Sequence, residues 1–395
     1  MQNVSYPGLV PLELDVLFED VSETISLTPR DGWARKGSVA CYYKSGQALS
    51  GFQTIDDIRY HFDLSGELDT GWFFENGERY YGSTSAKNLG EVLSGWLKTD
   101  GFHYYLNPDN SAYGQAVKGF MTIYGARYHF DDFYELELGW ITVNGDRYYA
   151  STSTATLGEI ATGWLRMNGK TYYLLPNKPD QGLAVNGFYT INGTRYHFND
   201  KGEMNIGWFS DNGYTYYANP GKEQTGKIMT GWNRIGGKTY YLSKKKDILG
   251  RKATGVIKVG KYQYCLTSFG VRVTGFQKIN GKTYFFSPST GRKVRNRWFL
   301  NKGRNYFADK KGAIARNCFV YSNGKKSTLN LKELKKMKTK YYVDKKGRRM
   351  TSKWVRIKGK RYYADSKGRI LMNCIRIINN KKYQFNASGA GKKSD

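Results

Sequence analysis

The chain is poor in cysteine, proline and histidine, with 4 Cys, 8 Pro and 4 His among 395 residues. The cysteines are far apart and never form a C-x-x-C pair, so neither a disulfide framework nor a zinc site is predicted. No uninterrupted run of about eighteen apolar residues occurs, which excludes an ordinary membrane-spanning helix. Long apolar helical stripes are also missing, so a helical bundle is not expected.

Aromatic residues and glycine are abundant instead. The chain contains 33 Tyr, 20 Phe, 9 Trp and 46 Gly, although its mean hydropathy is only -0.64. Disordered chains share this polarity but are poor in aromatic residues. Tyrosine and glycine at this level favour short strands joined by tight turns.

The net charge of +29 is unevenly distributed. Residues 1–207 carry 16 Lys and Arg against 25 Asp and Glu, whereas residues 208–395 carry 46 against 8. An asymmetry of this size bears on partners more than on fold. It predicts that the C-terminal half is attracted to a polyanion.

A short repeat runs along the chain. In fourteen copies an aromatic or apolar residue, here called the slot residue, is followed eight positions later by a Tyr that opens an aromatic pair. The copy around Trp33 misses this spacing and is interpreted as slightly longer. The slot residues are Trp72, Trp96, Trp140, Trp164, Trp208, Trp232, Trp298, Trp354, Phe52, Phe120, Phe188, Val256, Phe276 and Ile375.

Asn-Gly pairs lie between the two aromatic positions of several copies, for example Asn76-Gly77 and Asn144-Gly145. This dipeptide between short β-prone runs is the strongest local signal for a β-hairpin. Each copy therefore predicts one hairpin. Glycine before the slot, from Gly51 to Gly275, indicates a bend or a close approach of two backbones.

A longer period is superimposed, because Trp72, Trp140 and Trp208 are 68 residues apart. The chain is predicted to be all-β, a solenoid with about three hairpins per 68-residue turn. We expect an N-terminal cap or upstream remnant at residues 1–30, regular hairpins at 31–310, and basic, irregular repeats at 311–395. Residues 327–340 within the last segment predict one short basic helix.

The copies GWFFENGERYYG, GWLRMNGKTYYL and GWNRIGGKTYYL resemble the cell-wall-binding repeats of Gram-positive surface proteins. That superfamily includes choline-binding repeats, glucan-binding repeats and the C-terminal repeats of clostridial toxins. The resemblance covers about residues 31–386. It implies a β-hairpin solenoid outside the cell, usually attached to an enzyme, toxin or adhesin domain.

Choline-binding repeats usually carry a second Trp before the Tyr pair, and aromatic rings then cage a quaternary ammonium by cation–π attraction. Here that position holds residues such as Arg79, His103, Arg147 and Thr171, and an arginine would repel a cation. The NGKTYYL copies are closer to glucan- and toxin-type repeats, which implies recognition of sugars.

Two sets of candidate binding residues follow, alongside the structural role that most of these rings are expected to have. Flat, partly exposed Trp and Tyr rings suit stacking on a sugar face, and the basic runs suit a polyanion. The ligand-binding candidates are Trp72, Trp96, Trp140, Trp164, Trp208, Trp232, Trp298, Trp354, Tyr81, Tyr105, Tyr149, Tyr173, Tyr217 and Tyr241; the polyanion-binding candidates are Lys345, Lys346, Arg348, Arg349, Lys358, Lys360 and Arg361.

No catalytic residue, metal ligand or cofactor is predicted. His61, His129 and His197 recur every 68 residues, and inheritance with the repeat explains them better than a shared metal ion. A catalytic site needs a unique set of groups, whereas these residues recur. The chain is therefore not expected to be an enzyme.

These observations predict a non-catalytic extracellular module that attaches to cell-wall carbohydrate or to an anionic polymer such as teichoic acid. Two alternatives remain: a host-glycan receptor region of a toxin or adhesin, and the wall-targeting part of a larger wall enzyme. Nucleic acid and a membrane span are not expected. The first residues lack a basic start before an apolar core, so a truncated start is expected for a protein of the cell surface.

Overall fold

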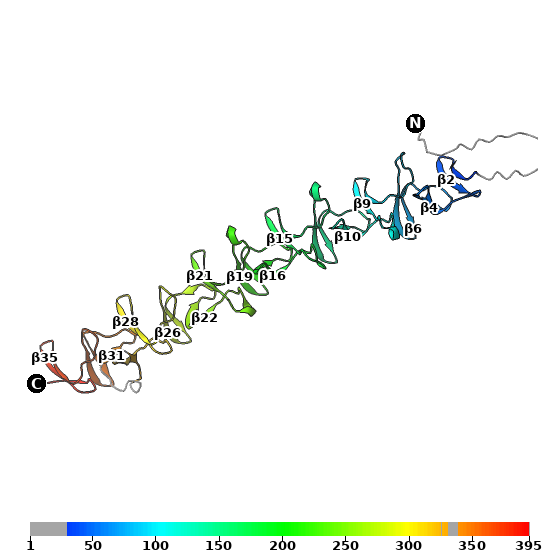
Figure 1. The fold of residues 1–395 in the computed structure, drawn as a ribbon. Helices are drawn as coiled ribbons and strands as arrows, with labels where there is room; N and C mark the ends of the chain where they lie inside the picture. The colour runs from blue at the N-terminus through cyan, green and yellow to red at the C-terminus, as the bar shows by residue number, and fades with distance from the viewer. Residues whose placement is uncertain (1–29, 325, 331–338, 395) are drawn as a thin grey trace, which may run out of the picture. The chain divides into compact units, whose positions relative to one another are not determined.

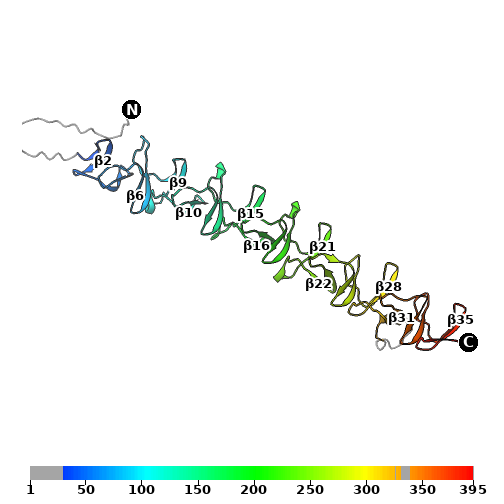
Figure 2. The ribbon, with the colours of Figure 1, turned by 180° about the vertical axis from the view of Figure 1, so that it is seen from behind.

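The computed structural model describes residues 30–324, 326–330 and 339–394. The chain divides into two units, Met1–Tyr189 with Phe198–Met204, and Thr190–His197 with Asn205–Asp395. The predicted cap at residues 1–30 lies almost wholly outside the described residues. Within each unit the β-hairpins follow one another in chain order (Figures 1 and 2).

The first unit is built from short strands joined in antiparallel pairs. Its strands are β1 (Gly32–Lys36), β2 (Val39–Lys44), β3 (Gln47–Ala48), β4 (Gly51–Ile55), β5 (Ile58–Phe62), β6 (Gly71–Glu75), β7 (Glu78–Gly82), β8 (Gly95–Thr99), β9 (Phe102–Leu106), β10 (Gly119–Ile123), β11 (Ala126–Phe130), β12 (Gly139–Val143), β13 (Asp146–Ala150), β14 (Gly163–Met167) and β15 (Lys170–Leu174). Strands β16 (Gly187–Ile191) and β17 (Thr194–Phe198) divide their residues between the units.

The second unit continues the same plan. Its strands are β18 (Gly207–Asp211), β19 (Tyr214–Ala218), β20 (Gly231–Ile235), β21 (Lys238–Leu242), β22 (Gly255–Val259), β23 (Tyr262–Leu266), β24 (Arg272–Val273), β25 (Gly275–Ile279), β26 (Lys282–Phe286), β27 (Arg297–Asn301), β28 (Arg304–Ala308), β29 (Cys318–Ser322), β30 (Ser327–Thr328), β31 (Thr339–Val343), β32 (Lys353–Ile357), β33 (Lys360–Ala364), β34 (Cys374–Ile378), β35 (Lys381–Phe385) and β36 (Gly391–Lys393). Single-turn 3-10 helices occur in the loops of the two units at η1 (Asn110–Ala112), η2 (Thr154–Thr156), η3 (Lys222–Gln224) and η4 (Lys246–Ile248).

The predicted hairpin turns are confirmed. Asn144 and Gly145 have φ of 52° and 88°, and both central residues of a type I′ turn require positive φ. The slot glycines are bends, since Gly51 and Gly139 have φ of 67° and 78°. A close backbone approach is not the reason, because a Cβ atom added at either would meet nothing within 4 Å.

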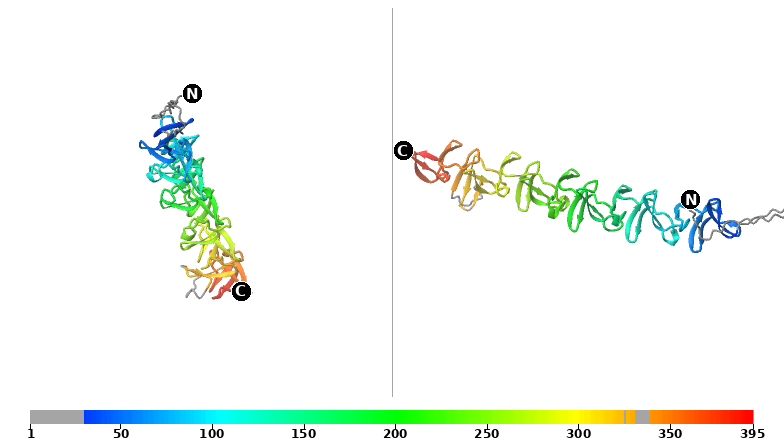
Figure 3. Two further views of the ribbon diagram at one scale, coloured as in Figure 1. Left: turned by 90° about the vertical axis from the view of Figure 1, so that its right-hand side faces the viewer. Right: turned by 90° about the horizontal axis from the view of Figure 1, so that it is seen from above.

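Loops tie each hairpin to the one before it. The loop after β10–β11 sends the backbone N–H of Leu136 to the carbonyl of His103 on β9, 2.8 Å away. Ile160 repeats the contact with Arg127, and Ile314 with Thr283 in the second unit. Residues at the ends of the second strands, such as Phe62 and Leu106, are fully buried against these loops. Each unit is thus a stack of tandem hairpins, which Figure 3 shows from two further sides, and the predicted all-β repeat fold is confirmed.

Two expectations are wrong. The copy at Trp33 is not longer: Trp33 pairs with Tyr42 in the register that joins Trp72 to Tyr81, and Cys41 takes the place of the first Tyr. The segment 327–340 is not a helix at its ends, since 327–328 is β30 and 339–340 begins β31, both paired with β29. Residues 331–338 lie outside the described residues.

The insertion falls inside a hairpin, which explains the second error. Phe319 on β29 pairs with Tyr342 on β31, so the aromatic pair of this copy is present but displaced along the chain. Completing that pair requires the end of the insertion to be extended. At residues 339–340, pairing with β29 therefore takes precedence over the local helical pattern.

We predict that Gly145→Val lowers the free energy of unfolding by about 1–2 kcal/mol, because a β-branched side chain is strained at positive φ. Urea unfolding followed by circular dichroism measures the change. Thr142→Val, at an exposed strand position of the same hairpin, is the control and should have little effect. Equal losses for both variants would contradict the turn assignment.

Candidate functional site

Aromatic rings of neighbouring hairpins meet in a recurring arrangement, here called the inter-hairpin cluster. It contains the slot ring, the second Tyr of the same hairpin and the first Tyr of the next. The Trp72 ring lies 5.0 Å from Tyr81 and 4.7 Å from Tyr104, edge to face in both pairs. Trp96 lies 5.2 Å from Tyr105 and 5.1 Å from Tyr128. Each cluster therefore joins two successive hairpins.

The candidate rings differ in exposure. Trp96 and Trp164 are each 43% exposed and Trp208 is 39% exposed, so these rings present most surface to solvent. The other five slot tryptophans, Trp72, Trp140, Trp232, Trp298 and Trp354, are half-buried. Among the second tyrosines, Tyr81 and Tyr105 are buried, while Tyr149, Tyr173, Tyr217 and Tyr241 are half-buried.

The sequence prediction missed the first Tyr of each pair as a cluster member. Alternation along the strand turns Tyr104 to the face opposite Tyr105, and that face packs on the preceding hairpin. Residues in this role include Tyr104, Tyr128, Tyr172, Tyr240, Tyr264, Tyr341 and Tyr383. The alternation of side chains along each strand was the signal in the sequence. It identifies the first Tyr as a cluster member only when one knows which hairpin packs on which.

Arginines cover several slot rings in the first unit. The Cζ atoms of Arg79 and Arg147 lie 3.9 and 4.3 Å from the ring centroids of Trp72 and Trp140. Arg59 and Arg127 lie 3.8 and 3.7 Å above the rings of the phenylalanine slot residues before them. These distances are typical of a cation–π contact.

The same guanidinium groups reach a distant loop. Nη1 of Arg79 donates a hydrogen bond of 2.9 Å to the carbonyl of Phe133, 54 residues further along the chain. Arg59 reaches Tyr113 over the same separation. The partners of Arg127 and Arg147 also lie 54 residues on, at Gln181 and Lys201. Each arginine thus fastens its hairpin to the loop that follows the second hairpin after it.

The cluster at Trp33 has no arginine at this strand position, where Ala40 pairs with Arg35. A cavity of about 230 Å³ lies there, with the rings of Trp33 and Tyr60 and the carboxylates of Asp56 and Glu91 in its wall. A second cavity of about 200 Å³ adjoins Phe120, and Arg127 itself forms part of its wall.

Cations approach three slot rings of the second unit from the segments that follow the hairpins, where Lys252 and Arg349 lie in loops and Arg272 lies on β24. Lys252, Arg272 and Arg349 place their charged groups 5.4, 5.7 and 5.5 Å from the rings of Trp208, Trp232 and Trp298. Arg361 is an exception, since it lies on the strand beside Trp354, 4.6 Å from its ring.

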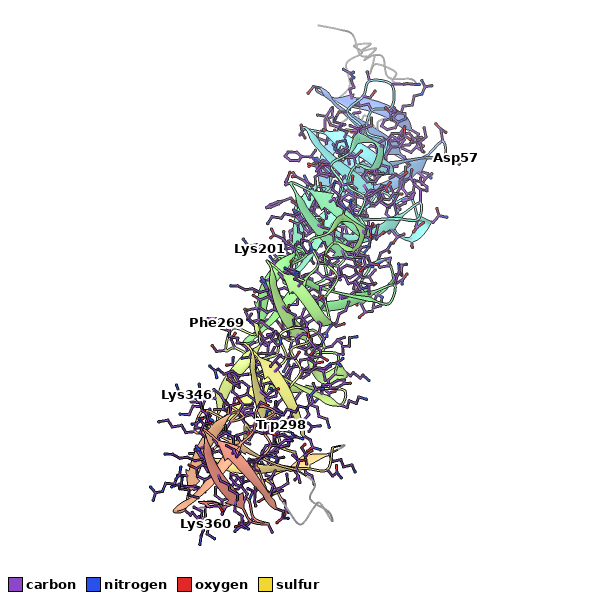
Figure 4. All side chains as sticks on the ribbon, turned by 90° about the vertical axis from the view of Figure 1, so that its left-hand side faces the viewer. Asp57, Lys201, Phe269, Trp298, Lys346 and Lys360 are labelled. Carbon is purple, nitrogen blue, oxygen red and sulfur yellow. The ribbon has the colours of Figure 1, made fainter. Side chains whose placement is uncertain are left out.

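The predicted polyanion residues have two kinds of surroundings. Lys345, Lys346, Lys358, Lys360 and Arg361 are exposed, and Figure 4 shows Lys346 and Lys360 at the outside of the ribbon. Arg348 is instead paired with Asp344, with Nη2 2.8 Å from Oδ2. Arg349 lies between Trp298 and Tyr341, 5.5 Å from each ring.

The charge asymmetry appears at one structural position, here called the rim position. In each loop, one residue donates its backbone N–H to a carbonyl of the preceding hairpin, as Leu136 does to His103. The rim position is the residue immediately before that donor. The rim residues are Glu67, Glu91, Gln115, Glu135, Glu159, Leu183 and Glu203 in the first unit, and Lys227, Arg251, Val271, Arg292, Ala313, Arg348 and Arg369 in the second.

Rim residues contact cluster tyrosines. The hydroxyl of Tyr104 donates to Oε1 of Glu135, 3.3 Å away, and burial together with this carboxylate raises the pKa of Tyr104. In the second unit Nε of Arg251 donates to the hydroxyl of Tyr216 at 3.2 Å. The edge of the clusters is therefore acidic in the first unit and basic in the second.

The histidines belong to the packing. The ring of His61 stacks on Phe73 at 4.5 Å, and its Nδ1 lies 2.7 Å from Asp69 Oδ2. His129 makes the equivalent contact with Glu137. Within the described residues no three His, Cys, Asp or Glu side chains are grouped to hold a metal ion, and no helix is long and apolar enough to cross a membrane.

Family comparisons agree with the repeat. Residues 50–68, 139–153, 186–204, 230–245 and 352–370 match a model described as a putative cell wall binding repeat, and residues 273–319 match a choline-binding repeat. The matched segments make up less than half of the chain, and they are similar to repeats of the cell-wall-binding superfamily. A search of curated proteins finds no significant match.

Solved structures from Streptococcus pneumoniae are similar to the chain. CbpJ is 24% identical over 72% of this chain and 99% of its own, with a TM-score of 0.44. Choline binding protein F is 23% identical over 67% and 98%, with a TM-score of 0.42. The modular autolysin LytC, solved with a synthetic peptidoglycan ligand, is 20% identical over 65% and 53%, with a TM-score of 0.39.

Lys340 yields a pH prediction. Its side chain is buried between Phe319 and Tyr362 and donates to the carbonyl of Ser388, and burial lowers the pKa of its ammonium. Because the charged form is disfavoured only in the folded state, this destabilisation is fully present at low pH and decreases as pH rises from the folded pKa toward the higher unfolded pKa.

We therefore expect the wild type to gain stability relative to Lys340→Met as pH rises toward the unfolded pKa of about 10.4, as measured by urea unfolding at each pH. Lys360→Met removes an exposed lysine and is the control. Its difference from wild type should not change with pH. A constant difference for Lys340→Met would show that burial of this ammonium has no energetic effect.

Proposed function

We propose that the chain is a non-catalytic extracellular module that anchors a protein to the cell envelope by binding wall carbohydrate and an anionic wall polymer. The observation that carries this proposal is the series of exposed slot tryptophans, Trp96, Trp164 and Trp208, each packed edge to face against a tyrosine of its own hairpin. Such a ring offers a flat apolar face held in a fixed orientation. Sugar rings stack on surfaces of this kind.

Repetition makes weak sites effective. A single sugar stacked on one Trp would bind weakly. Once one site of the chain holds the polymer, the effective concentration of polymer at the neighbouring sites rises. A wall polymer presents many copies of the same unit. The repeat of the chain therefore matches the repeat of its proposed ligand.

The basic second unit supports an anionic component. Its rim position carries Lys227, Arg251, Arg292, Arg348 and Arg369, where the first unit has mainly glutamate. Exposed lysines add to this charge at Lys345, Lys346, Lys358 and Lys360. A phosphate-bearing wall polymer such as teichoic acid has the complementary charge, and release of its counterions would make binding depend on salt.

The tests below also distinguish two alternative roles for the chain. A host-glycan receptor would bind a neutral or acidic host sugar and ignore bacterial walls. The chain would also act as a wall-targeting segment if it is joined to a wall enzyme, in which case the same binding would direct catalysis located elsewhere.

The first test compares retention of the purified chain on native walls and on walls stripped of teichoic acid, across a salt series. We expect retention on native walls to fall steeply with salt and to decrease on stripped walls. Replacing Lys345, Lys346, Lys358 and Lys360 with Gln should flatten the salt dependence. Equal retention on both walls, insensitive to salt, would remove the polymer from the proposal, and no retention on either would overturn wall binding.

A second test addresses the rings. Trp96→Ala should weaken wall binding at high salt several-fold, because about 1–3 kcal/mol of stacking and burial is lost from an exposed platform. Phe74→Ala removes an exposed aromatic ring that is not a slot residue and is the control. Similar losses in both variants would mean that the slot ring is not a binding platform.

A further inference from the structure

The strand arginines of the first unit lie where an external cation would have to lie. In the pairing of β6 with β7, Trp72 and Arg79 are diagonal neighbours on one face of the hairpin. That face packs against Tyr104 of the next hairpin. The guanidinium of Arg79 is 3.9 Å from the Trp72 ring and 6.0 Å from the Tyr104 ring, so it lies within the inter-hairpin cluster.

The guanidinium is held there from two directions. Its Nη1 donates to the carbonyl of Phe133, and its Nε is shielded from solvent without an acceptor. The ring of Tyr134, beside that carbonyl, lies 5.6 Å from Cζ. An ammonium ligand entering this cluster would have to displace a cation that the chain fixes by a hydrogen bond and by ring contacts.

From Trp72 to Trp164, the exposure of the slot tryptophan follows the presence of this arginine. Trp72 and Trp140, which are covered by Arg79 and Arg147, are half-buried, whereas Trp96 and Trp164, whose partner strands carry His103 and Thr171 at the same position, are each 43% exposed. The side chain at one strand position thus corresponds to a closed or an open cluster.

We propose that Arg79 and Arg147, with Arg59 and Arg127 at the phenylalanine copies, are resident cations of the first unit. Each fills its own aromatic cluster in place of an external cation and closes that cluster to quaternary ammonium ligands. Clusters without such an arginine, at Trp96 and Trp164, stay open. The strand position before the Tyr pair is therefore a specificity-determining position of the repeat.

The resident-cation role is tested with small cations on the full chain. Methylguanidinium and tetramethylammonium are titrated while the indole N–H signals of Trp72 and Trp140 are followed by NMR, assigned through Trp72→Phe and Trp140→Phe. Neither signal should move in the wild type. In Arg79→Ala the Trp72 signal should move with a dissociation constant in the range of roughly 1–10 mM, while Trp140 stays unchanged.

Arg166→Ala is the matched control, because it removes an exposed arginine of the first unit that lies on a strand bearing a slot Trp. It should leave the Trp72 signal insensitive to both cations. Methylguanidinium should also raise the melting temperature of Arg79→Ala, since it replaces the missing group, and should not raise that of Arg166→Ala. Arg147→Ala repeats the test at Trp140 if Arg79→Ala does not fold.

Two results would overturn the proposal. One is a wild-type Trp72 signal that moves as far as it does in Arg79→Ala, which would mean that the arginine closes nothing. The other is a folded Arg79→Ala and a folded Arg147→Ala that bind neither cation, which would mean that the guanidinium does not occupy a cation site.

A second arm rests on the proposed wall-binding function and uses a soluble glycan fragment released from walls. The Trp96 signal should move, and those of Trp72 and Trp140 should not. Movement of Trp72 and Trp140 together with Trp96 would overturn the division into open and closed clusters. If no Trp signal moves, the proposed wall function fails, and the result with small cations still decides whether the arginines are resident cations.

Discussion

The packing of a slot ring between two tyrosines is the interaction on which the rest of the structure depends. A single hairpin buries too little surface to be stable in water, and within each unit the aromatic contacts pass from one hairpin to the next. Trp72 illustrates this, since it touches Tyr81 of its own hairpin and Tyr104 of the following one. Each such pair contributes about 0.5–1.5 kcal/mol beyond its buried area, and repetition turns these contacts into a continuous core.

This constraint explains why rings are retained while charge varies. A slot residue or a Tyr that is lost opens the stack, so most copies keep these positions. Rim residues contact only the edge of the cluster and can be exchanged without opening it. Glu135 and Arg251 both bond to a cluster tyrosine, yet they carry opposite charges. The acidic and basic halves of the sequence therefore share one packing scheme and differ in surface charge. Much of that difference in charge lies at the rim position, beside the rings of the clusters.

Much of the fold could be predicted from the sequence because its determinants are local. The spacing from Trp140 to Tyr148 and the Asn144-Gly145 turn define one hairpin without reference to any other. The interpretation of Trp33 was wrong because it took the first Tyr as the marker, whereas the structure preserves the pairing of Trp33 with Tyr42. The role of Arg79 could not be predicted, since its partner Phe133 is 54 residues away and becomes a neighbour only when two further hairpins are stacked.

The arginine contacts also link stability to specificity. A guanidinium over Trp72 removes that face of the ring from any ligand and at the same time fastens β7 to the loop after β11. Where His103 replaces it, the Trp96 ring is exposed, and it keeps its ring contacts with Tyr105, Tyr128 and Phe130. Because each hairpin can make this exchange independently, a repeat of this kind can divide its copies between those that hold the stack together and those that leave the slot ring exposed to solvent.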